Sequence, residues 1–290
     1  MRGSDGTPLG WQVNGLHLAG LAWGEQGQRP VLALHGWLDN AASFTLLAPR
    51  LTGCHVVALD LTGHGRSDHR SADASYQIWD DLPEILGVMD ALGWEQCDVI
   101  GHSRGAIIAG LLAAAFPERV AHLVMLDAVS PEAIADEDVV VQLRRALLDK
   151  QRLGAREAKI FASVEEAVQS RASRGLPPAA ARLLVMRNQR RCKGGVTWTT
   201  DARLHGASAV KLTGVQIRAV LEALTMPVLL LLAADTRADY QEYLAEHARS
   251  HIRDIRIRRI TGGHHFHMEK GAADAAQAIN KFLGIEREVT

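Results

Sequence analysis

The stretch that decides the expected fold is Val99-Ile100-Gly101-His102-Ser103-Arg104-Gly105-Ala106-Ile107-Ile108-Ala109. A short apolar run leads into the pattern Gly-x-Ser-x-Gly, and an apolar segment of helical character continues to Phe116. A strand, a sharp turn and a helix in this order are typical of a nucleophile elbow, which holds a serine hydroxyl clear of the backbone. Gly101 and Gly105 lack the Cβ atoms that would collide where the strand and the helix approach each other. We therefore interpret Ser103 as a candidate nucleophile at a helix N-terminus, where the helix dipole favours negative charge.

Length and composition limit the classes of protein to which the chain can belong. With 290 residues, 47% of them hydrophobic, it can bury a large core as one α/β domain, with or without an insertion. The net charge of −1 gives no global field that would attract nucleic acid or an acidic membrane, so we expect no nucleic-acid partner. Cys54, Cys97 and Cys192 are odd in number and widely spaced, which favours a reducing, cytoplasmic location over a disulfide framework.

We expect neither a signal peptide nor a membrane span. Residues 1–10 are polar and rich in glycine, which is unlike a secretory leader. The apolar run after the elbow stops at Pro117 and is too short to cross a bilayer. It is predicted to be a buried helix.

Buried strands alternate with helical segments on both sides of the elbow. The other expected strands are 31–34, 56–61, 120–126, 227–233 and 255–260, and the expected helices are 41–51, 76–92, 217–224, 239–250 and 272–283. This alternation predicts a mostly parallel sheet that is covered by helices on both faces. Asn14-Gly15 lies between two apolar segments and predicts a hairpin, which would form an antiparallel edge of that sheet.

The strand pattern disappears over residues 131–213, which we interpret as a helical cap inserted into a core made of residues 1–130 and 214–290. Charged helical segments are expected in the insertion, with Pro177-Pro178 as a break. An insertion at the carboxyl ends of the strands would cover Ser103 as a lid. Its densest basic run is interpreted as a solvated helix face, with a phosphate or partner contact as the alternative; the run comprises Arg187, Arg190, Arg191 and Lys193.

A serine nucleophile needs a base, and the loop after the last strand supplies histidines. His264 directly follows a Gly-Gly turn and is our candidate base, whereas His265 and His267 are spaced to face away from it in an extended loop. A zinc site would need histidines on a helical or hairpin spacing and a further ligand. The loop offers no such frame, so we expect no metal ligands.

Two further elements of a serine hydrolase site can be placed on the sequence. Asp127 and Asp235 each follow a predicted strand and could orient the imidazole, although each could instead cap a loop or a helix. The oxyanion hole needs two backbone N–H donors, for which we expect the amides of Arg104 and Trp37, since Gly36 allows a sharp turn before Trp37.

Together these motifs resemble those of the α/β-hydrolase superfamily. They occur in the same order along the chain as in that superfamily and cover nearly its whole length. They are His-Gly-Trp at 35–37, Leu-Asp-Leu-Thr-Gly-His-Gly-Arg-Ser-Asp at 59–68, Gly-His-Ser-Arg-Gly at 101–105 and Gly-His at 263–264. More narrowly, residues 35–41, 43–44 and 197–204 are similar to the serine-hydrolase-like proteins, a branch of poorly defined substrate. The resemblance implies a mostly parallel eight-stranded sheet, a helical cap after the sixth strand, no cofactor, and hydrolysis through an acyl-enzyme.

Two positions depart from the pattern of that superfamily. Its usual acid position is occupied by Thr236, with Asp235 one place early, and some branches take the acid from the end of the sixth strand, where Asp127 stands. We therefore favour Asp127 and keep Asp235 as the alternate. Ser103 stands where related dehalogenases and epoxide hydrolases can have aspartate, which argues against both reactions because they need a carboxylate that attacks carbon.

The expected function is hydrolysis of a small or medium carboxylic ester by Ser103 and His264. The same residues could cleave a thioester, a lactone or a C–C bond. An alternative from another class is that the chain is a hydrolase-like binding protein without catalytic turnover. A third possibility is that the basic run in the cap docks a partner protein. We expect a monomer or homodimer that acts on a small ester-like molecule.

Overall fold

An eight-stranded sheet runs through the computed structural model, which describes residues 5–154 and 159–285. Its strands are β1 (Thr7–Val13), β2 (Leu16–Trp23), β3 (Arg29–Leu34), β4 (Cys54–Leu59), β5 (Cys97–His102), β6 (Val120–Leu126), β10 (Val228–Ala233) and β11 (Ile255–Ile260). Their order is β1-β2-β4-β3-β5-β6-β10-β11, antiparallel from β1 to β4 and parallel from there on. The predicted, mostly parallel sheet is confirmed, and the Asn14-Gly15 hairpin forms its edge.

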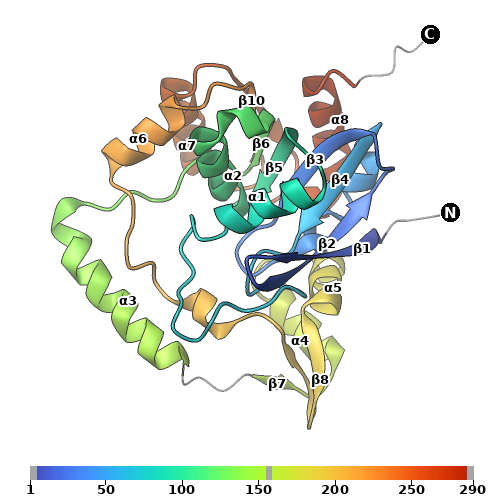
Figure 1. Ribbon diagram of the computed structural model, residues 1–290, viewed down its shortest axis with the longest axis vertical. Helices are drawn as coiled ribbons and strands as arrows, with labels where there is room; N and C mark the ends of the chain where they lie inside the picture. The colour runs from blue at the N-terminus through green and yellow to red at the C-terminus, as the bar shows by residue number, and fades with distance from the viewer. Residues whose placement is uncertain (1–4, 155–158, 286–290) are drawn as a thin grey trace.

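Helices cover both faces of the sheet (Figure 1). One face is covered by α1 (Leu82–Ala91), α2 (Arg104–Ala115), α6 (Gly214–Glu222) and α7 (Ala238–His251), and the other by η1 (Ala41–Phe44), η2 (Ala48–Arg50) and α8 (Ala272–Phe282). Two expected helices are shorter than predicted. Residues 41–51 form two 3-10 turns, and the helix expected from residue 76 begins at Leu82, with a proline in its first turn. β5 is buried along its whole length, which is why it reads as an apolar run.

In the segment between β6 and α6, buried residues between positions 161 and 196 form a small hydrophobic core, to which Met268 also contributes. Its helices are η4 (Asp136–Asp138), α3 (Val139–Gly154), α4 (Val164–Ala172), α5 (Pro178–Arg187) and η5 (Ala202–His205). It also holds a three-stranded sheet in the order β7-β9-β8, made of β7 (Ile160–Phe161), β8 (Gln189–Cys192) and β9 (Gly195–Trp198). The prediction of a purely helical insertion is therefore wrong, because strands of two to four residues leave almost no periodic signal. Pro177-Pro178 lies between α4 and α5, as the predicted break requires, with Pro178 as the first residue of α5.

The expectation of a solvated basic helix face in this segment is also wrong. Arg187 is buried, and its guanidinium donates to both carboxylate oxygens of Asp60 at 2.9 Å and to the carbonyl of Gly20 at 3.1 Å. Arg190 and Arg191 lie in β8 rather than in a helix. Burial without a paired carboxylate would cost several kcal/mol per charge, so Asp60 explains how an arginine enters the interior.

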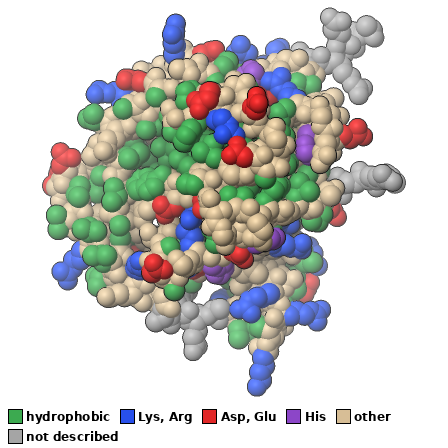
Figure 2. Space-filling model, in the orientation of Figure 1, with side chains coloured by type: hydrophobic (Ala, Val, Ile, Leu, Met, Phe, Trp, Pro, Cys, Tyr) green, Lys and Arg blue, Asp and Glu red, His purple; other side chains and the backbone are tan. Residues whose placement is uncertain are grey.

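The helix α3 extends away from the sheet and exposes apolar side chains, including Val140, Val141, Leu147 and Leu148. Figure 2 shows hydrophobic side chains gathered on the side of the molecule where α3 and α6 lie. Among the described residues, none of the helices combines the length and the apolar character that spanning a membrane requires.

Candidate active site

The strained turn between β5 and α2 presents Ser103. The backbone of Ser103 has φ 51° and ψ −119°, in a region that non-glycine residues seldom adopt. A Cβ atom at Gly105 would lie 2.1 Å from the carbonyl oxygen of Leu34, and one at Gly101 would lie 2.4 Å from that of Gly105. Strand and helix are therefore as close as the Gly-x-Ser-x-Gly pattern predicts. Strain of about 1–3 kcal/mol at one residue persists only where the surroundings hold it in place, and here they hold the serine.

His264 is hydrogen bonded to Asp127. The Nδ1–H of His264 donates to Oδ2 of Asp127 at 2.6 Å, across 137 residues of sequence. The other carboxylate oxygen, Oδ1, accepts from the backbone N–H of Ala233 at 2.8 Å and from Nε2 of Gln241 at 3.1 Å. With Nδ1 carrying the proton, the neutral imidazole keeps Nε2 as an acceptor. The ring can therefore take a proton from a hydroxyl.

The environment of Asp127 keeps it ionised. Burial of the carboxyl group would raise its pKa, but the hydrogen bonds from His264, the Ala233 amide and Gln241 outweigh burial and hold the pKa below its usual range. Asp127 itself adopts φ 55°, so its side chain leaves the end of β6 at an unusual angle. A carboxylate in this position stabilises positive charge on the imidazole.

The alternate acid, Asp235, has a different partner. It is exposed, and its Oδ2 accepts from the backbone N–H of Gly262 at 3.1 Å. Thr236, at the usual acid position, instead accepts at Oγ1 from Gln241 at 2.7 Å. Gln241 thus bridges Thr236 and Asp127, a role that no feature of the sequence indicated.

Backbone contacts tie the serine turn to the loops of the acid and the base. The backbone N–H of Ser103 donates to the carbonyl of Leu126, the residue before Asp127, at 2.9 Å. Nε2 of His102, the residue before Ser103, lies 2.8 Å from the carbonyl oxygen of His264 and must donate to it, because a carbonyl only accepts. Three segments that are far apart in sequence are thereby held together.

The predicted oxyanion donors are the backbone amides of Arg104 and Trp37. Arg104 is the first residue of α2, and amides at that position have no partner within the helix. In the loop after β3, the amide of Leu38 donates to His64, and the amide of Asp39 donates to the carbonyl of Gly36. The amide of Trp37 comes just before these two in the chain. The indole of Trp37 is 49% exposed and donates to the carbonyl of Leu204 at 2.8 Å, so Trp37 is not the core aromatic residue that its type suggests.

The prediction of an extended histidine loop is wrong. Residues Phe266–Met268 form the 3-10 turn η6, which directs the three histidines to three different partners. His264 bonds Asp127, Nε2 of His265 lies 3.2 Å from Oδ2 of Asp39, and Nε2 of His267 lies 2.8 Å from the hydroxyl of Ser43. The prediction that both other histidines face away from His264 is also wrong for His265, because its ring meets that of His264 edge to face, with 5.1 Å between centroids. His267 is fully buried.

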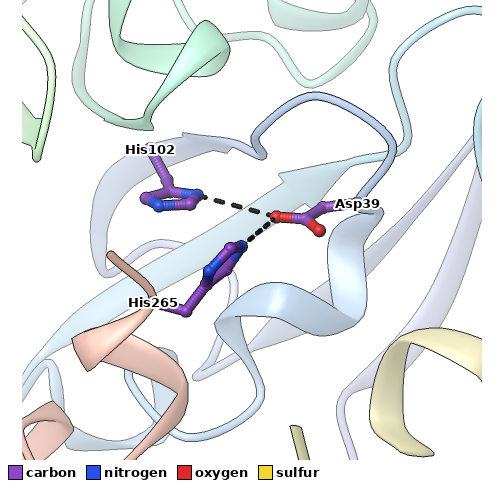
Figure 3. A group of neighbouring side chains, drawn as sticks. All are labelled: Asp39, His102 and His265. Atoms are coloured by element: carbon purple, nitrogen blue, oxygen red, sulfur yellow. Dashed lines mark hydrogen bonds and ion pairs between the residues drawn. The ribbon is translucent and has the colours of Figure 1, made fainter. Parts of the chain in front are cut away.

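Asp39 is a buried residue of this region that the sequence interpretation missed. Its carboxylate lies beside His102 and His265 (Figure 3) and also pairs with the guanidinium of Arg171 from α4. Burial would raise the pKa of Asp39, but these neighbours outweigh burial and hold the pKa well below its usual range. The motif His-Gly-Trp-Leu-Asp-Asn contained this aspartate, but its partners lie up to 226 residues away in sequence.

A cavity of about 60 Å³ lies between the loop after β3 and the inserted segment. Its lining includes Leu38 from that loop and Arg171, Arg174, Trp198 and His205 from the insertion. The ring of His205 also meets that of Trp37 edge to face, with 5.5 Å between centroids. The insertion therefore contributes side chains to the space beside the loop that carries the Trp37 amide.

Comparisons with known proteins agree with this architecture. Residues 29–271 match a family described as alpha/beta hydrolase fold. The chain is 30% identical to serine hydrolase-like protein 2 of Homo sapiens, over 92% of this chain and 90% of that protein. It is 29% identical to a serine hydrolase-like protein of Dictyostelium discoideum, over 95% and 81%. The crystal structure of a hypothetical protein from Pseudomonas aeruginosa PAO1 is similar at 35% identity and a TM-score of 0.90, covering 96% of this chain and 99% of that one.

Proposed function

Because the chain belongs to the α/β-hydrolase superfamily and is similar to serine hydrolase-like proteins, we propose that it cleaves a small or medium carboxylic ester through an acyl-enzyme on Ser103. The observation that carries the proposal is the hydrogen bond of 2.6 Å between His264 and Asp127, together with the hydrogen bond from His102, the residue before Ser103, to the carbonyl of His264. A binding protein has no need of an oriented base next to such a serine.

The reaction follows from the roles of these groups. Nε2 of His264 takes the proton of the Ser103 hydroxyl while Oγ attacks the ester carbonyl, and the carbonyl oxygen becomes an oxyanion. The amides of Trp37 and Arg104 donate to that oxyanion, each contributing about 2.7–4 kcal/mol to lowering the barrier. Asp127 stabilises the imidazolium, which then gives its proton to the leaving alcohol. Water cleaves the acyl-enzyme by the same steps in reverse order.

Residues 131–213 act in this proposal as a lid over the core made of residues 1–130 and 214–290. The cavity beside Leu38 receives part of the substrate, since it adjoins the loop that carries the Trp37 amide. A thioester, a lactone or a C–C bond would use the same residues, so substrate choice depends on this cavity rather than on the chemistry. The cytoplasmic location and the monomeric or homodimeric state remain predictions.

A fluorophosphonate probe tests the proposal directly, because it labels only an activated serine. We expect labelling of the parent protein and none of Ser103→Ala. Rates on nitrophenyl esters, acyl-CoA thioesters and lactones then identify the bond that is cleaved. A parent protein that is folded, unlabelled and inactive on all three would favour the binding protein, and Ser103→Ala hydrolysing esters as fast as the parent would refute the proposed nucleophile.

A further inference from the structure

We propose that Asp39, His102 and His265 form a binding site for a divalent transition-metal ion such as Zn²⁺, directly behind the catalytic residues. The three side chains come from the loop after β3, the end of β5 and the loop after β11, and they converge in Figure 3. Two imidazoles and a carboxylate are a donor set that suits zinc and its neighbours in the first transition row.

The distances between the ligand atoms are those of a compact site. Oδ2 of Asp39 lies 3.2 Å from Nε2 of His265 and 3.6 Å from Nδ1 of His102. All three atoms lie within 4.8 Å of one another. A tetrahedral ion with bonds of about 2.0–2.2 Å separates its ligands by about 3.3–3.6 Å. The two separations from Asp39 are close to these values, and the two imidazole nitrogens lie within 4.8 Å of each other.

The strongest evidence is the state of the His102 ring. Its Nε2–H donates to the carbonyl of His264 at 2.8 Å, so in the neutral ring Nδ1 carries a lone pair. His102 is fully buried, and its Nδ1 has no hydrogen-bond partner among the described residues. Its lone pair then faces a carboxylate oxygen, and a cation between the two removes the repulsion.

Space and charge around the three ligands are compatible with an ion. A Cβ atom at Gly36 would lie 2.8 Å from Nδ1 of His102 and 3.1 Å from Oδ2 of Asp39, so the glycine leaves room beside both atoms. Arg171 pairs with the other carboxylate oxygen, Oδ1, and leaves Oδ2 available. The positive charge of Arg171 neutralises Asp39 and weakens the attraction of this carboxylate for the ion. In other proteins, however, three neutral histidines alone are enough to hold zinc.

An ion in this site would affect catalysis because two of its ligands are adjacent in sequence to the proposed nucleophile and the proposed base. His102 immediately precedes Ser103, and His265 immediately follows His264. Ligation of both rings shifts the serine and the base from their hydrogen-bonded positions, so we expect bound Zn²⁺ to inhibit hydrolysis reversibly. This consequence rests on the proposed function, whereas ion binding itself does not.

Calorimetric titration of tag-free protein with Zn²⁺ tests the site independently of activity. We expect one ion per chain, and an affinity at least tenfold lower in His265→Gln. Asp39→Asn is the second variant and should lose at least as much, with thermal unfolding of both variants recorded to verify that they are folded. Co²⁺ provides a second readout, because ligation by two histidines and a carboxylate gives visible absorption bands that His265→Gln should abolish.

The matched control is His247→Gln, because a surface pair could also bind the ion. His247 and His251 lie one turn apart in α7, with 5.0 Å between their ring centroids. This variant should keep the affinity of the parent. The proposal is overturned if the parent binds no Zn²⁺, or if His265→Gln binds it as tightly as the parent. A loss of binding in His247→Gln alone would assign the ion to the surface pair.

Discussion

Replacement of Asp127 by asparagine is the sharpest perturbation of the proposed mechanism. The carboxylate accepts three hydrogen bonds, two at Oδ1 from Ala233 and Gln241 and one at Oδ2 from His264. In Asp127→Asn the amide oxygen can satisfy the two donors at the Oδ1 position. The amide NH₂ then faces Nδ1 of His264 and favours the tautomer that is protonated at Nε2. That tautomer cannot accept the serine proton.

The size of the effect follows from these contacts. In the active tautomer, the Nδ1–H of His264 faces the NH₂ group of the asparagine, so two donors meet and neither has an acceptor. An unsatisfied buried donor costs about 1–3 kcal/mol. The variant also lacks a hydrogen bond to a charged group, which contributes about 1.5–3 kcal/mol once the imidazole is protonated. We therefore expect kcat/KM to fall by about 10²- to 10⁴-fold, since each 1.36 kcal/mol of barrier is tenfold in rate.

The assay is kcat/KM on a nitrophenyl ester at neutral pH, together with urea unfolding to verify stability. Asp235→Asn is the matched control, because it changes the same chemical group at the other candidate position. Its carboxylate accepts from Gly262 at 3.1 Å, and one such bond is worth about 0.5–1.5 kcal/mol. The control should keep at least a tenth of the parent activity. Comparable losses in both variants, or nearly full activity in Asp127→Asn, would refute the reasoning.

Three further outcomes follow from contacts in the structure. Arg187→Met leaves a buried aspartate unpaired and should lower the free energy of unfolding by about 3–5 kcal/mol in urea titrations, whereas the exposed Arg190→Gln should change it by less than about 0.5 kcal/mol. Gly105→Ala places a Cβ atom 2.1 Å from a backbone carbonyl oxygen, so its circular dichroism spectrum should show that the native fold is lost. In Gly214→Ala the added Cβ meets nothing within 4 Å, so this variant should give the spectrum of the parent. Asp39 has a lowered pKa in the folded state, so its stabilising contribution is present above the unfolded value of about 3.9 and is lost as the pH falls through the folded value. Urea unfolding from pH 7 to 3 should therefore show a steeper loss of stability for the parent than for Asp39→Asn; equal slopes would contradict this assignment.

Much of the fold could be predicted because its signals are local. The elbow needs glycine at two fixed positions around Ser103, and the hairpin needs residues such as Asn14-Gly15 that tolerate positive φ. Strands buried on both faces read as apolar runs, of which β10 is an example. Short strands carry no such signal, so the sheet of β7, β8 and β9 escaped prediction.

The candidate site likewise contains residues that local sequence patterns indicated and a residue that only the folded structure distinguishes. The elbow pattern and the Gly-Gly turn indicated Ser103 and His264 as candidates, and two aspartates remained for the third position. Only the folded chain distinguishes them, because the backbone angle of Asp127 turns its carboxylate to Nδ1 of His264 while Asp235 bonds a backbone amide. A side chain at the end of a strand can rotate toward either neighbour, and no local pattern decides the direction.

By itself the sequence determined the α/β alternation and the strained serine turn, because these depend on backbone preferences within a few residues. The tertiary structure alone decided the partners of buried charges. Arg187 with Asp60, and Asp39 with Arg171 and His265, join positions more than one hundred residues apart. Burial makes an unpaired charge costly wherever it lies, but the identity of its partner depends on which surfaces the whole fold brings into contact.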